Sequence, residues 1–448
     1  MQIFSNNIFM NKGKNNLKNK NYNINNNLPN NNLNNKKNNT QVKIFQNNND
    51  KNINNISNLN QLNSNNLIKK KLILGKNLGL TKSNPIEKRK RPNSISKFSD
   101  YNNEIFGPHA KGLVNVGATC YMNATLQCMA HIQRLTYSLL KPKNIEKISS
   151  NKPKYKLSYE YIEVLKNLWK KKNIKYYSPD NFKNVISEMN PLFAGIQAND
   201  SKDLVLFLME TLHNELNTPV KKDISNQSNQ IVNQNDYETT FKLFSNFFTN
   251  NYRSIISDIF YGMYNSIMTC LNCNYVTHNV QCFNILIFRL EEVRKFKGKI
   301  ENKVKIIECF EYYQKVDNMF GENKIYCNHC KSHSNSCNTS KLIISPNVLV
   351  INLNRGKGLE FNIKIDLDEY LDIKKFVYYE KSPSYYELIG IVTHFGSSDM
   401  SGHFIAFCKS FIDQNWYKYN DSEVSISSFD EAKYTGVHYI LFYSYIQR

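Results

Sequence analysis

The stretch that decides the fold runs Gly112-Leu113-Val114-Asn115-Val116-Gly117-Ala118-Thr119-Cys120-Tyr121-Met122-Asn123-Ala124. Glycines and an asparagine lead into a cysteine, and good helix formers follow, so we expect a helix from Cys120 to about Tyr137. A cysteine at a helix N-terminus is expected to have a lowered pKa and to be a better nucleophile near neutral pH. Asn115, just upstream, offers an amide N–H to a developing oxyanion.

A nucleophilic cysteine needs a histidine that takes the thiol proton and returns it to the leaving amine. His403 stands out because a glycine precedes it and an apolar strand follows it. If this strand and the one that ends near Tyr419 form a hairpin, Asn420 comes to the same end as His403. Its carbonyl oxygen can then accept the imidazole Nδ1–H. Asp421 is the adjacent candidate, expected to support Asn420.

Both segments resemble motifs of the ubiquitin-specific proteases. The first resembles their Cys box and continues through Leu126-Gln127, and Trp416-Tyr417-Lys418-Tyr419-Asn420-Asp421-Ser422 resembles the second part of their His box. The resemblance implies an α+β fold with a papain-like cysteine protease core, a helical thumb, an antiparallel β palm and zinc-ribbon fingers. It implies a deubiquitinase that hydrolyses the bond after the C-terminal glycine of ubiquitin. Cys120, His403 and Asn420 would be catalytic, with Asn115 and Asp421 in support.

Three other functions fit parts of the sequence. The chain could be a protease for a ubiquitin-like modifier or a non-catalytic ubiquitin-binding module, although Cys120, His403 and Asn420 are all present. A zinc-ribbon nucleic-acid protein would explain the net charge of +21 but would leave the Cys and His boxes unexplained.

Two C-x-x-C pairs lie in the middle of the chain, Cys270-Leu271-Asn272-Cys273 and Cys327-Asn328-His329-Cys330. Four thiolates complete the tetrahedral shell of a structural zinc ion, and the long gap between the pairs fits two hairpins joined at their tips. A redox motif needs only one such pair, so two pairs favour a metal. Because protein fills all four positions, we expect this zinc to take no part in catalysis.

An acidic segment precedes a predicted helix at 201–216. Gln197-Ala198-Asn199-Asp200-Ser201-Lys202-Asp203-Leu204 resembles, with departures, the family's box that lines the channel for the arginine-containing tail of ubiquitin. Asp200 and Asp203 are therefore candidate substrate-binding residues, because a carboxylate can pair bidentately with arginine. Asp200 could instead cap the helix, or do both. The loop at 396–402 is expected to close over the substrate tail.

The order of elements predicts an α+β chain. Helices are expected at 155–170 and at 201–216. Another helix is expected to begin at Ser178-Pro179-Asp180, with a capping hydroxyl and a proline in its first turn. A flexible insertion is expected at 218–237. Strands are expected at 348–353, 387–394, 403–409, 416–419 and 439–445. The predicted catalytic domain spans residues 108–446, with the thumb at about 108–217, the fingers at 238–345 and the palm at 346–446.

Residues 1–107 are dominated by Asn and Lys, and they cannot bury enough apolar surface to fold, so we expect a disordered tail. The tail holds 18 Lys and Arg against 4 Asp and Glu, and so carries +14 of the net charge of +21. It could bind polyanions, although biased composition explains the lysines equally well. The remaining charge is expected to be spread over the folded part without a basic stripe.

Localisation is constrained by several features. No signal peptide is apparent at the N-terminus, and no run of eighteen apolar residues predicts a membrane span. Ten cysteines without a secretory signal favour a reducing compartment. Lys88-Arg89-Lys90-Arg91 is a candidate nuclear-import signal, so cytoplasm and nucleus both stay open.

Overall fold

The structure is a computed structural model that describes residues 111–169, 174–220, 236–355, 362–396 and 402–447. The tail predicted at 1–107, with its cluster at Lys88–Arg91, lies outside these ranges. Most of the insertion predicted at 218–237 and of the loop at 396–402 does so as well. The described residues all fall within one compact unit, Asn93–Arg448.

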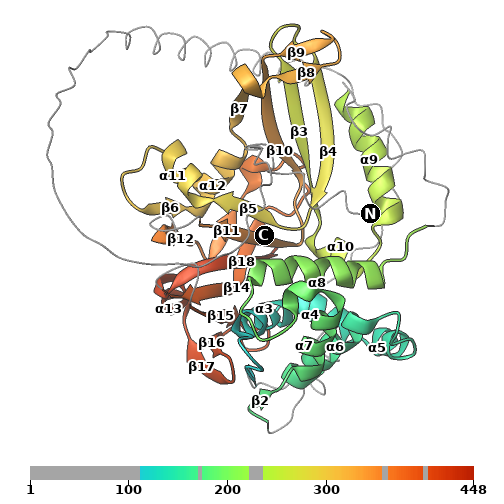
Figure 1. Cartoon of the computed structure of the whole chain (residues 1–448), viewed down its shortest axis with the longest axis vertical. Helices are drawn as coiled ribbons and strands as arrows, with labels where there is room; N and C mark the ends of the chain where they lie inside the picture. The colour runs from blue at the N-terminus through green and yellow to red at the C-terminus, as the bar shows by residue number, and fades with distance from the viewer. Residues whose placement is uncertain (1–110, 170–173, 221–235, 356–361, 397–401, 448) are drawn as a thin grey trace, which may run out of the picture. The chain divides into compact units, whose positions relative to one another are not determined.

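The first part of this unit is the helical thumb (Figure 1). Its helices are α3 (Cys120–Ala130), α4 (Gln133–Leu139), α5 (Pro142–Ser149), α6 (Lys156–Trp169), α7 (Asp180–Met189) and α8 (Ser201–Leu216). The helices predicted at 155–170 and 201–216 are confirmed as α6 and α8. None of the helices in the described ranges is both long and apolar enough to cross a bilayer.

One predicted helix end and one predicted cap are wrong, whereas the helix start predicted at Ser178-Pro179-Asp180 is confirmed by α7. The helix expected to reach Tyr137 stops at Ala130, because the Ala130 carbonyl accepts from Thr136 Oγ1 at 2.7 Å and from Trp169 Nε1 at 3.2 Å. These side-chain donors take the place of a helical backbone N–H. Ser178 does not cap α7, since Pro179 occupies the N-cap position and no side chain caps the helix.

The palm is a large sheet with the strand order β17-β16-β15-β14-β18-β11-β5, and β13 also pairs with β14. Its strands are β5 (Leu286–Arg289), β11 (Val348–Asn354), β13 (Tyr370–Asp372), β14 (Tyr385–Phe395), β15 (His403–Lys409), β16 (Trp416–Asn420), β17 (Glu423–Ser427) and β18 (Val437–Tyr445). All five predicted strands are confirmed. The range predicted for the fingers also supplies β5, which pairs in parallel with β11, whereas the other pairs are antiparallel.

The large sheet is buried on both faces, which explains the unbroken apolar run of β11. Val348 and Val350 pack in the cluster that the thumb helices form, whereas Leu349 and Ile351 pack in a second cluster. That second cluster includes residues of α11 (Leu290–Phe296) and α12 (Ile306–Tyr313). Strands covered on both faces need apolar side chains at every position. Each fully buried aliphatic side chain contributes about 1.5–3 kcal/mol to folding.

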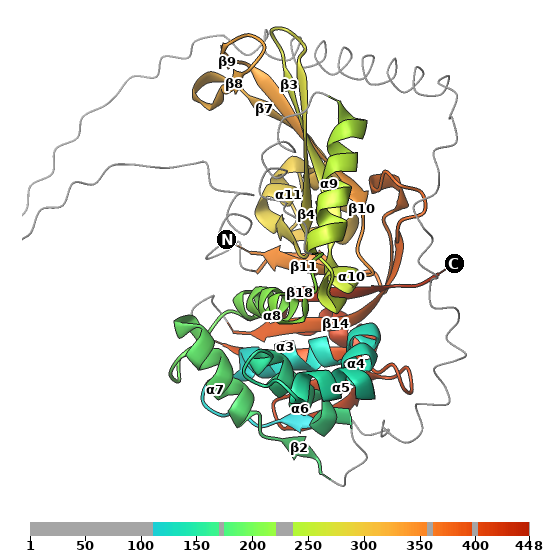
Figure 2. The same ribbon diagram turned by 90° about the vertical axis from the view of Figure 1, so that its right-hand side faces the viewer.

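The fingers form a separate antiparallel sheet with the order β4-β3-β10-β7, and a short hairpin, β8–β9, lies at its far end (Figures 1 and 2). The strands are β3 (Gly262–Cys270), β4 (Val276–Phe283), β7 (Val316–Met319), β8 (Ile325–Cys327), β9 (Ser332–Ser334) and β10 (Ser336–Ile344). Helix α9 (Tyr237–Asn251) covers this sheet and buries Phe244 against Met263, Val280 and Ile343.

Short elements connect these parts. They are β1 (Gly112–Leu113), β2 (Tyr176–Tyr177), η2 (Pro191–Phe193), α10 (Ile255–Phe260), β6 (Lys303–Lys305), η4 (Gly321–Asn323), β12 (Lys364–Asp366), η6 (Lys374–Phe376) and α13 (Phe429–Tyr434). Strand β1 matters for the site, because it brings the segment before Cys120 to the turn after β16.

Candidate active site

The loop before α3 is organised by one side chain. The Asn115 Oδ1 atom accepts from the backbone N–H groups of Gly117 at 3.2 Å and Thr119 at 2.9 Å. Gly117 has φ 112° and Ala118 has φ 47°, so two successive residues adopt the left-handed region. For Ala118 this conformation costs energy, as often occurs at functional sites. The loop ends at Cys120, the first residue of α3, which is 6% exposed.

The structure brings His403 and Asn420 together. His403 is the first residue of β15 and Asn420 the last of β16, and His403 Nε2 lies 2.6 Å from Asn420 Oδ1. The expectation that Nδ1 faces Asn420 is wrong. The register pairs Ala406 with Tyr419, so Asn420 approaches His403 diagonally and meets the ring nitrogen farther from the backbone. Nδ1 is therefore the nitrogen left to face a thiol.

Asp421 joins this pair to the loop of the nucleophile. Its Oδ1 atom accepts from Asn123 Nδ2 at 2.8 Å, and its Oδ2 atom accepts from Asn115 Nδ2 at 2.9 Å. Oδ2 also lies 3.9 Å from His403 Nε2. The backbone contributes too, since the Asp421 carbonyl accepts from the N–H of Leu113 at 2.8 Å. Sequence reasoning missed Asn123, although an amide within an otherwise apolar helical turn was the available signal.

Gly112 allows this close approach. A Cβ atom at this position would lie 2.3 Å from the Ser422 carbonyl oxygen, so any larger residue would push β1 away from the turn after β16. The glycine therefore sets the distance between the two segments that carry Asn115 and Asp421.

The electrostatics of Cys120 differ from the prediction. Burial raises the pKa of the Cys120 thiol, and the nearby Asp421 carboxylate raises it further. Backbone N–H groups, including that of Phe404, lower this pKa but do not offset the burial. The prediction of a lowered pKa from the helix N-terminus alone is wrong, because the thiol is almost fully excluded from water.

Within the described part of the chain, no hydrogen bond joins the Cys120 thiol to the His403 ring. The thiol lies instead against the backbone N–H of Phe404, the residue after His403. Catalytic hydrogen bonds are often long before substrate binds, so this separation is compatible with a working pair.

The acidic segment lies beside α3, the helix that begins at Cys120. Asp200 caps α8, because its Oδ1 atom accepts from the Lys202 N–H at 2.7 Å, and its Oδ2 atom accepts from the Tyr439 hydroxyl at 2.9 Å. Burial raises the Asp200 pKa. Asp203 Oδ1 lies 3.0 Å from Lys202 Nζ, and its side chain is 38% exposed. Tyr439 is a site residue that sequence reasoning missed, since it is 239 residues away from Asp200 in the chain.

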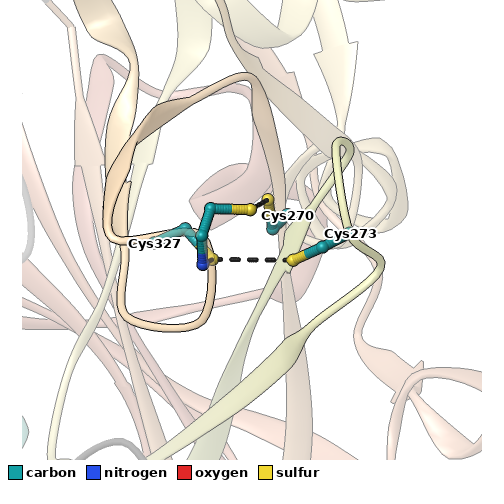
Figure 3. Close-up of side chains that lie close together, drawn as sticks. Cys270, Cys273 and Cys327 are labelled. Carbon is teal, nitrogen blue, oxygen red and sulfur yellow. Dashed lines mark hydrogen bonds between the residues drawn. The ribbon is translucent and has the colours of Figure 1, made fainter.

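The two C-x-x-C pairs come together at the far end of the fingers. Cys270 Sγ lies 3.8 Å from Cys330 Sγ and Cys273 Sγ lies 3.7 Å from Cys327 Sγ, and all four sulfur atoms lie within 4.8 Å of one another. Figure 3 shows Cys270, Cys273 and Cys327 pointing toward a common centre. This cluster of four cysteines could hold a metal ion.

The two halves of the cluster have the same backbone geometry. Asn274 and Lys331, which directly follow the second cysteine of each pair, have φ 58° and φ 55°. The N–H of Asn274 bonds the Cys270 carbonyl at 2.9 Å, and the N–H of Lys331 bonds the Cys327 carbonyl at 2.8 Å. Each pair thus forms a tight knuckle that presents two sulfur atoms to the other.

The structure thus places Cys120, His403 and the pair Asn420 and Asp421 on a helix and strands that adjoin one another. The chain belongs to the ubiquitin carboxyl-terminal hydrolase family, whose model matches residues 111–443. The roles of the individual site residues stay predictions.

Similar proteins share the family and the fold. The chain is 27% identical over 340 residues to ubiquitin carboxyl-terminal hydrolase 2 of Bos taurus, which covers 74% of this chain and 54% of that protein. It is 26% identical over 366 residues to ubiquitin carboxyl-terminal hydrolase 21 of Homo sapiens, covering 77% and 63%. The chain thus spans little more than half the length of these relatives.

A solved SAGA DUB module that contains Ubp8, Sgf11, Sus1 and Sgf73, bound to monoubiquitin, is similar in fold. The TM-score is 0.57 at 22% identity, and the match covers 79% of this chain and 74% of that chain. A second structure of this module, bound to ubiquitin aldehyde, matches with a TM-score of 0.56 at 23% identity and the same coverage.

Proposed function

We propose that this chain is a cysteine-type deubiquitinase that hydrolyses the peptide or isopeptide bond after the C-terminal glycine of ubiquitin. The observation that carries the proposal is the 2.6 Å contact of His403 with Asn420, next to the helix that begins at Cys120, in a chain of the ubiquitin carboxyl-terminal hydrolase family. The names of its relatives and the ubiquitin bound to the similar SAGA module support ubiquitin as the modifier.

In the proposed mechanism, His403 Nδ1 takes the Cys120 proton, because Asn420 already occupies Nε2. The thiolate attacks the carbonyl carbon of the ubiquitin glycine and forms a tetrahedral oxyanion. The Asn115 amide has two N–H donors, and the one that does not bond Asp421 can stabilise this oxyanion. Collapse breaks the C–N bond, and the leaving amine takes the proton from Nδ1.

The resulting thioester is hydrolysed by water. His403 Nδ1 accepts a proton from the attacking water and gives it to the Cys120 sulfur as the C–S bond breaks, and the product leaves as the ubiquitin carboxylate after its remaining proton passes to solvent. Asn420 holds the ring through both steps, and Asp421 holds Asn115 in place for the oxyanion. Every proton transfer in this cycle uses a residue of this chain, the substrate or water.

We also propose that the cysteine cluster holds a structural zinc ion. A tetrahedron with Zn–S bonds of about 2.3 Å has sulfur–sulfur edges of about 3.8 Å. The distances of 3.8 Å for Cys270–Cys330 and 3.7 Å for Cys273–Cys327 fit this geometry. Zinc would join the β3–β4 and β8–β9 knuckles, and with four protein ligands it would hold no reactive water.

Asp200 and Asp203 are the candidate contacts for the C-terminal tail of ubiquitin. Asp203 is partly exposed and offers a carboxylate to an arginine of the ubiquitin tail, whereas both Asp200 oxygens already accept hydrogen bonds. Asp200 would therefore act mainly by holding the start of α8 in place, and Asp203 would form the ion pair with the arginine.

Hydrolysis of a panel of modifier conjugates tests the function. The full chain is incubated with a ubiquitin–lysine isopeptide substrate and with matched substrates of ubiquitin-like modifiers, and release is followed by fluorescence anisotropy. We expect release from ubiquitin that Cys120→Ala abolishes. Cleavage of only a ubiquitin-like substrate would reassign the modifier. Tight ubiquitin binding without cleavage would indicate a non-catalytic binding module.

For location, we infer action in the cytoplasm, the nucleus or both. The ten cysteines favour a reducing compartment, and the basic cluster Lys88–Arg91 is a candidate import signal. The Asn- and Lys-rich tail would add weak binding to polyanions. Imaging of the full chain, with and without Gln at the four basic positions, tests the import signal, since nuclear accumulation should depend on them.

A further inference from the structure

One face of the thumb carries lysines without a carboxylate partner. Residues 141–156, which form α5 and lead into α6, hold six lysines and a single glutamate. Lys156 pairs with Glu188. The other five are exposed, and none lies within 4.0 Å of a carboxylate oxygen of a described residue. We call these residues the thumb lysine face: Lys141, Lys143, Lys147, Lys152 and Lys154.

The described ranges hold 23 other lysines, and about half of them have a carboxylate partner. Twelve of them have an ion pair: Lys156, Lys166, Lys202, Lys295, Lys297, Lys299, Lys303, Lys315, Lys375, Lys409, Lys418 and Lys433. Around α11 and α12, for example, Lys297 and Lys375 share Glu311 at 2.9 and 3.1 Å.

Three of these lysines lie against aromatic rings of the thumb. Lys147 Nζ and Lys154 Nζ lie 5.8 and 5.1 Å from the centre of the same Tyr155 ring, and Lys152 Nζ lies 4.0 Å from the Tyr159 ring. Tyr155 is only 5% exposed and belongs to the thumb core, so the two ammonium groups lie against a ring that the core holds in place. An anion bound at these lysines would gain from several positive charges at once.

A hollow borders this face. A cavity of about 220 Å³ opens beside α5, and its charged lining residues are Lys147, Arg253 and Asp258. Arg253 adds a cation next to the thumb lysine face. None of these residues takes part in the site built by Cys120 and His403.

We propose that the thumb lysine face binds the phosphate backbone of double-stranded nucleic acid without reading its sequence. Lysine ammonium groups act as point charges that suit phosphate oxygens, and a duplex carries a charge about every 1.7 Å, so several lysines can be neutralised at once. The five residues of the face include no arginine, the side chain that most often forms paired hydrogen bonds with the edge of a base and so recognises sequence. Its Tyr155 ring is buried beneath lysine side chains, which leaves no open platform for unstacked single-strand bases.

Fluorescence anisotropy with the full chain and a duplex DNA of about 30 base pairs tests this proposal, at salt concentrations from about 50 to 200 mM. The thumb variant replaces all five lysines of the face by Gln. The matched control replaces Lys295, Lys297, Lys299, Lys303 and Lys375 by Gln, and so removes the same charge. Cleavage of a ubiquitin conjugate by both variants would show that they are folded.

We expect the thumb variant to lose at least about tenfold in affinity and to lower the slope of log K against log salt by roughly 4, since each phosphate contact contributes about 0.9. The control should stay within about twofold of wild type. Equal losses of affinity in both variants would mean that the net charge of the chain, and not the thumb lysine face, determines DNA binding. An unchanged slope would place all binding on the tail. Competition by polyglutamate as effective as that by DNA would make the partner an acidic protein. Each of these three results overturns the proposal.

Discussion

Replacing Asn420 by alanine tests the geometry of the proposed catalytic histidine. The Asn420 oxygen lies 2.6 Å from His403 Nε2, and the ring becomes a cation once it has taken the thiol proton. A hydrogen bond to a charged group contributes about 1.5–3 kcal/mol, which corresponds to a loss of roughly ten- to a hundredfold in kcat. Since Asn420 is not proposed to contact the substrate, KM should change little.

Asp421 determines where in that range the loss falls. Its Oδ2 atom lies 3.9 Å from the same nitrogen, so it can partly replace the missing acceptor in Asn420→Ala. Its bonds to Asn115 and Asn123 limit its movement. The single change should therefore cost nearer tenfold, and Asn420→Ala combined with Asp421→Ala should cost more than the product of the single effects.

Steady-state cleavage of a ubiquitin–lysine conjugate measures these effects. Asn420→Asp keeps an acceptor and should retain activity within about tenfold of wild type. Asn415→Ala, in the turn of the same hairpin, is the matched control and should leave kcat unchanged. The reasoning is refuted if Asn420→Ala keeps full kcat, or if its loss appears only in KM.

Three further predictions concern stability, substrate binding and metal. Burial lowers the pKa of His131 to about 4 from 6.5. The unfolded chain thus binds a proton at this residue that the folded chain does not bind. As pH drops from about 6.5 to 4, His131 should lower the unfolding free energy by up to roughly 3 kcal/mol, in addition to what His213 and His438, whose pKa values are also lowered to about 4, contribute. Urea titrations should show this loss, and His131→Gln should reduce it. Asp200→Ala should destabilise the chain by about 1–2 kcal/mol in urea, whereas Asp200→Asn should keep the cap; a raised KM in the Asn variant alone would reveal a substrate contact. Metal analysis should find one zinc per chain, and Cys273→Ser should lose it and lower Tm; a metal-free wild type with the same Tm would contradict the zinc site.

Much of the site could be predicted because its determinants are local. The approach to Cys120 is a short run of residues with a strong turn and helix pattern, and the strands that carry His403 and Asn420 form a hairpin across a polar turn. The metal site is also local in this sense, because the C-x-x-C spacing alone indicates that each pair supplies two ligands. A functional motif that spans fewer than about twenty consecutive residues can be recognised from the sequence alone.

The rest depends on contacts between distant segments. Tyr439 meets Asp200 because β18, from the end of the chain, lies between β14 and β11 inside the large sheet. Strand β5 joins that sheet by parallel pairing with a strand from much later in the chain. The raised pKa of Cys120 has the same origin. A helix N-terminus is visible in the sequence, whereas the burial that outweighs it follows from packing against β15.

The orientation of the His403 ring could not be predicted from the sequence. The partner Asn420 could be predicted from the hairpin. Which ring nitrogen it meets depends on the strand register, which places Asn420 opposite Ile405, two residues along the strand from His403. Local patterns determine which residues meet, and the pairing register determines which atoms do.

The most direct test of the central claim is labelling of the full chain with a ubiquitin probe that carries a thiol-reactive C-terminus, followed by mapping of the modified peptide. The proposed function predicts one covalent adduct, located at Cys120, that is absent in Cys120→Ala although nine other cysteines remain. A folded, metal-loaded chain that forms no adduct, or an adduct that persists in Cys120→Ala, would contradict it.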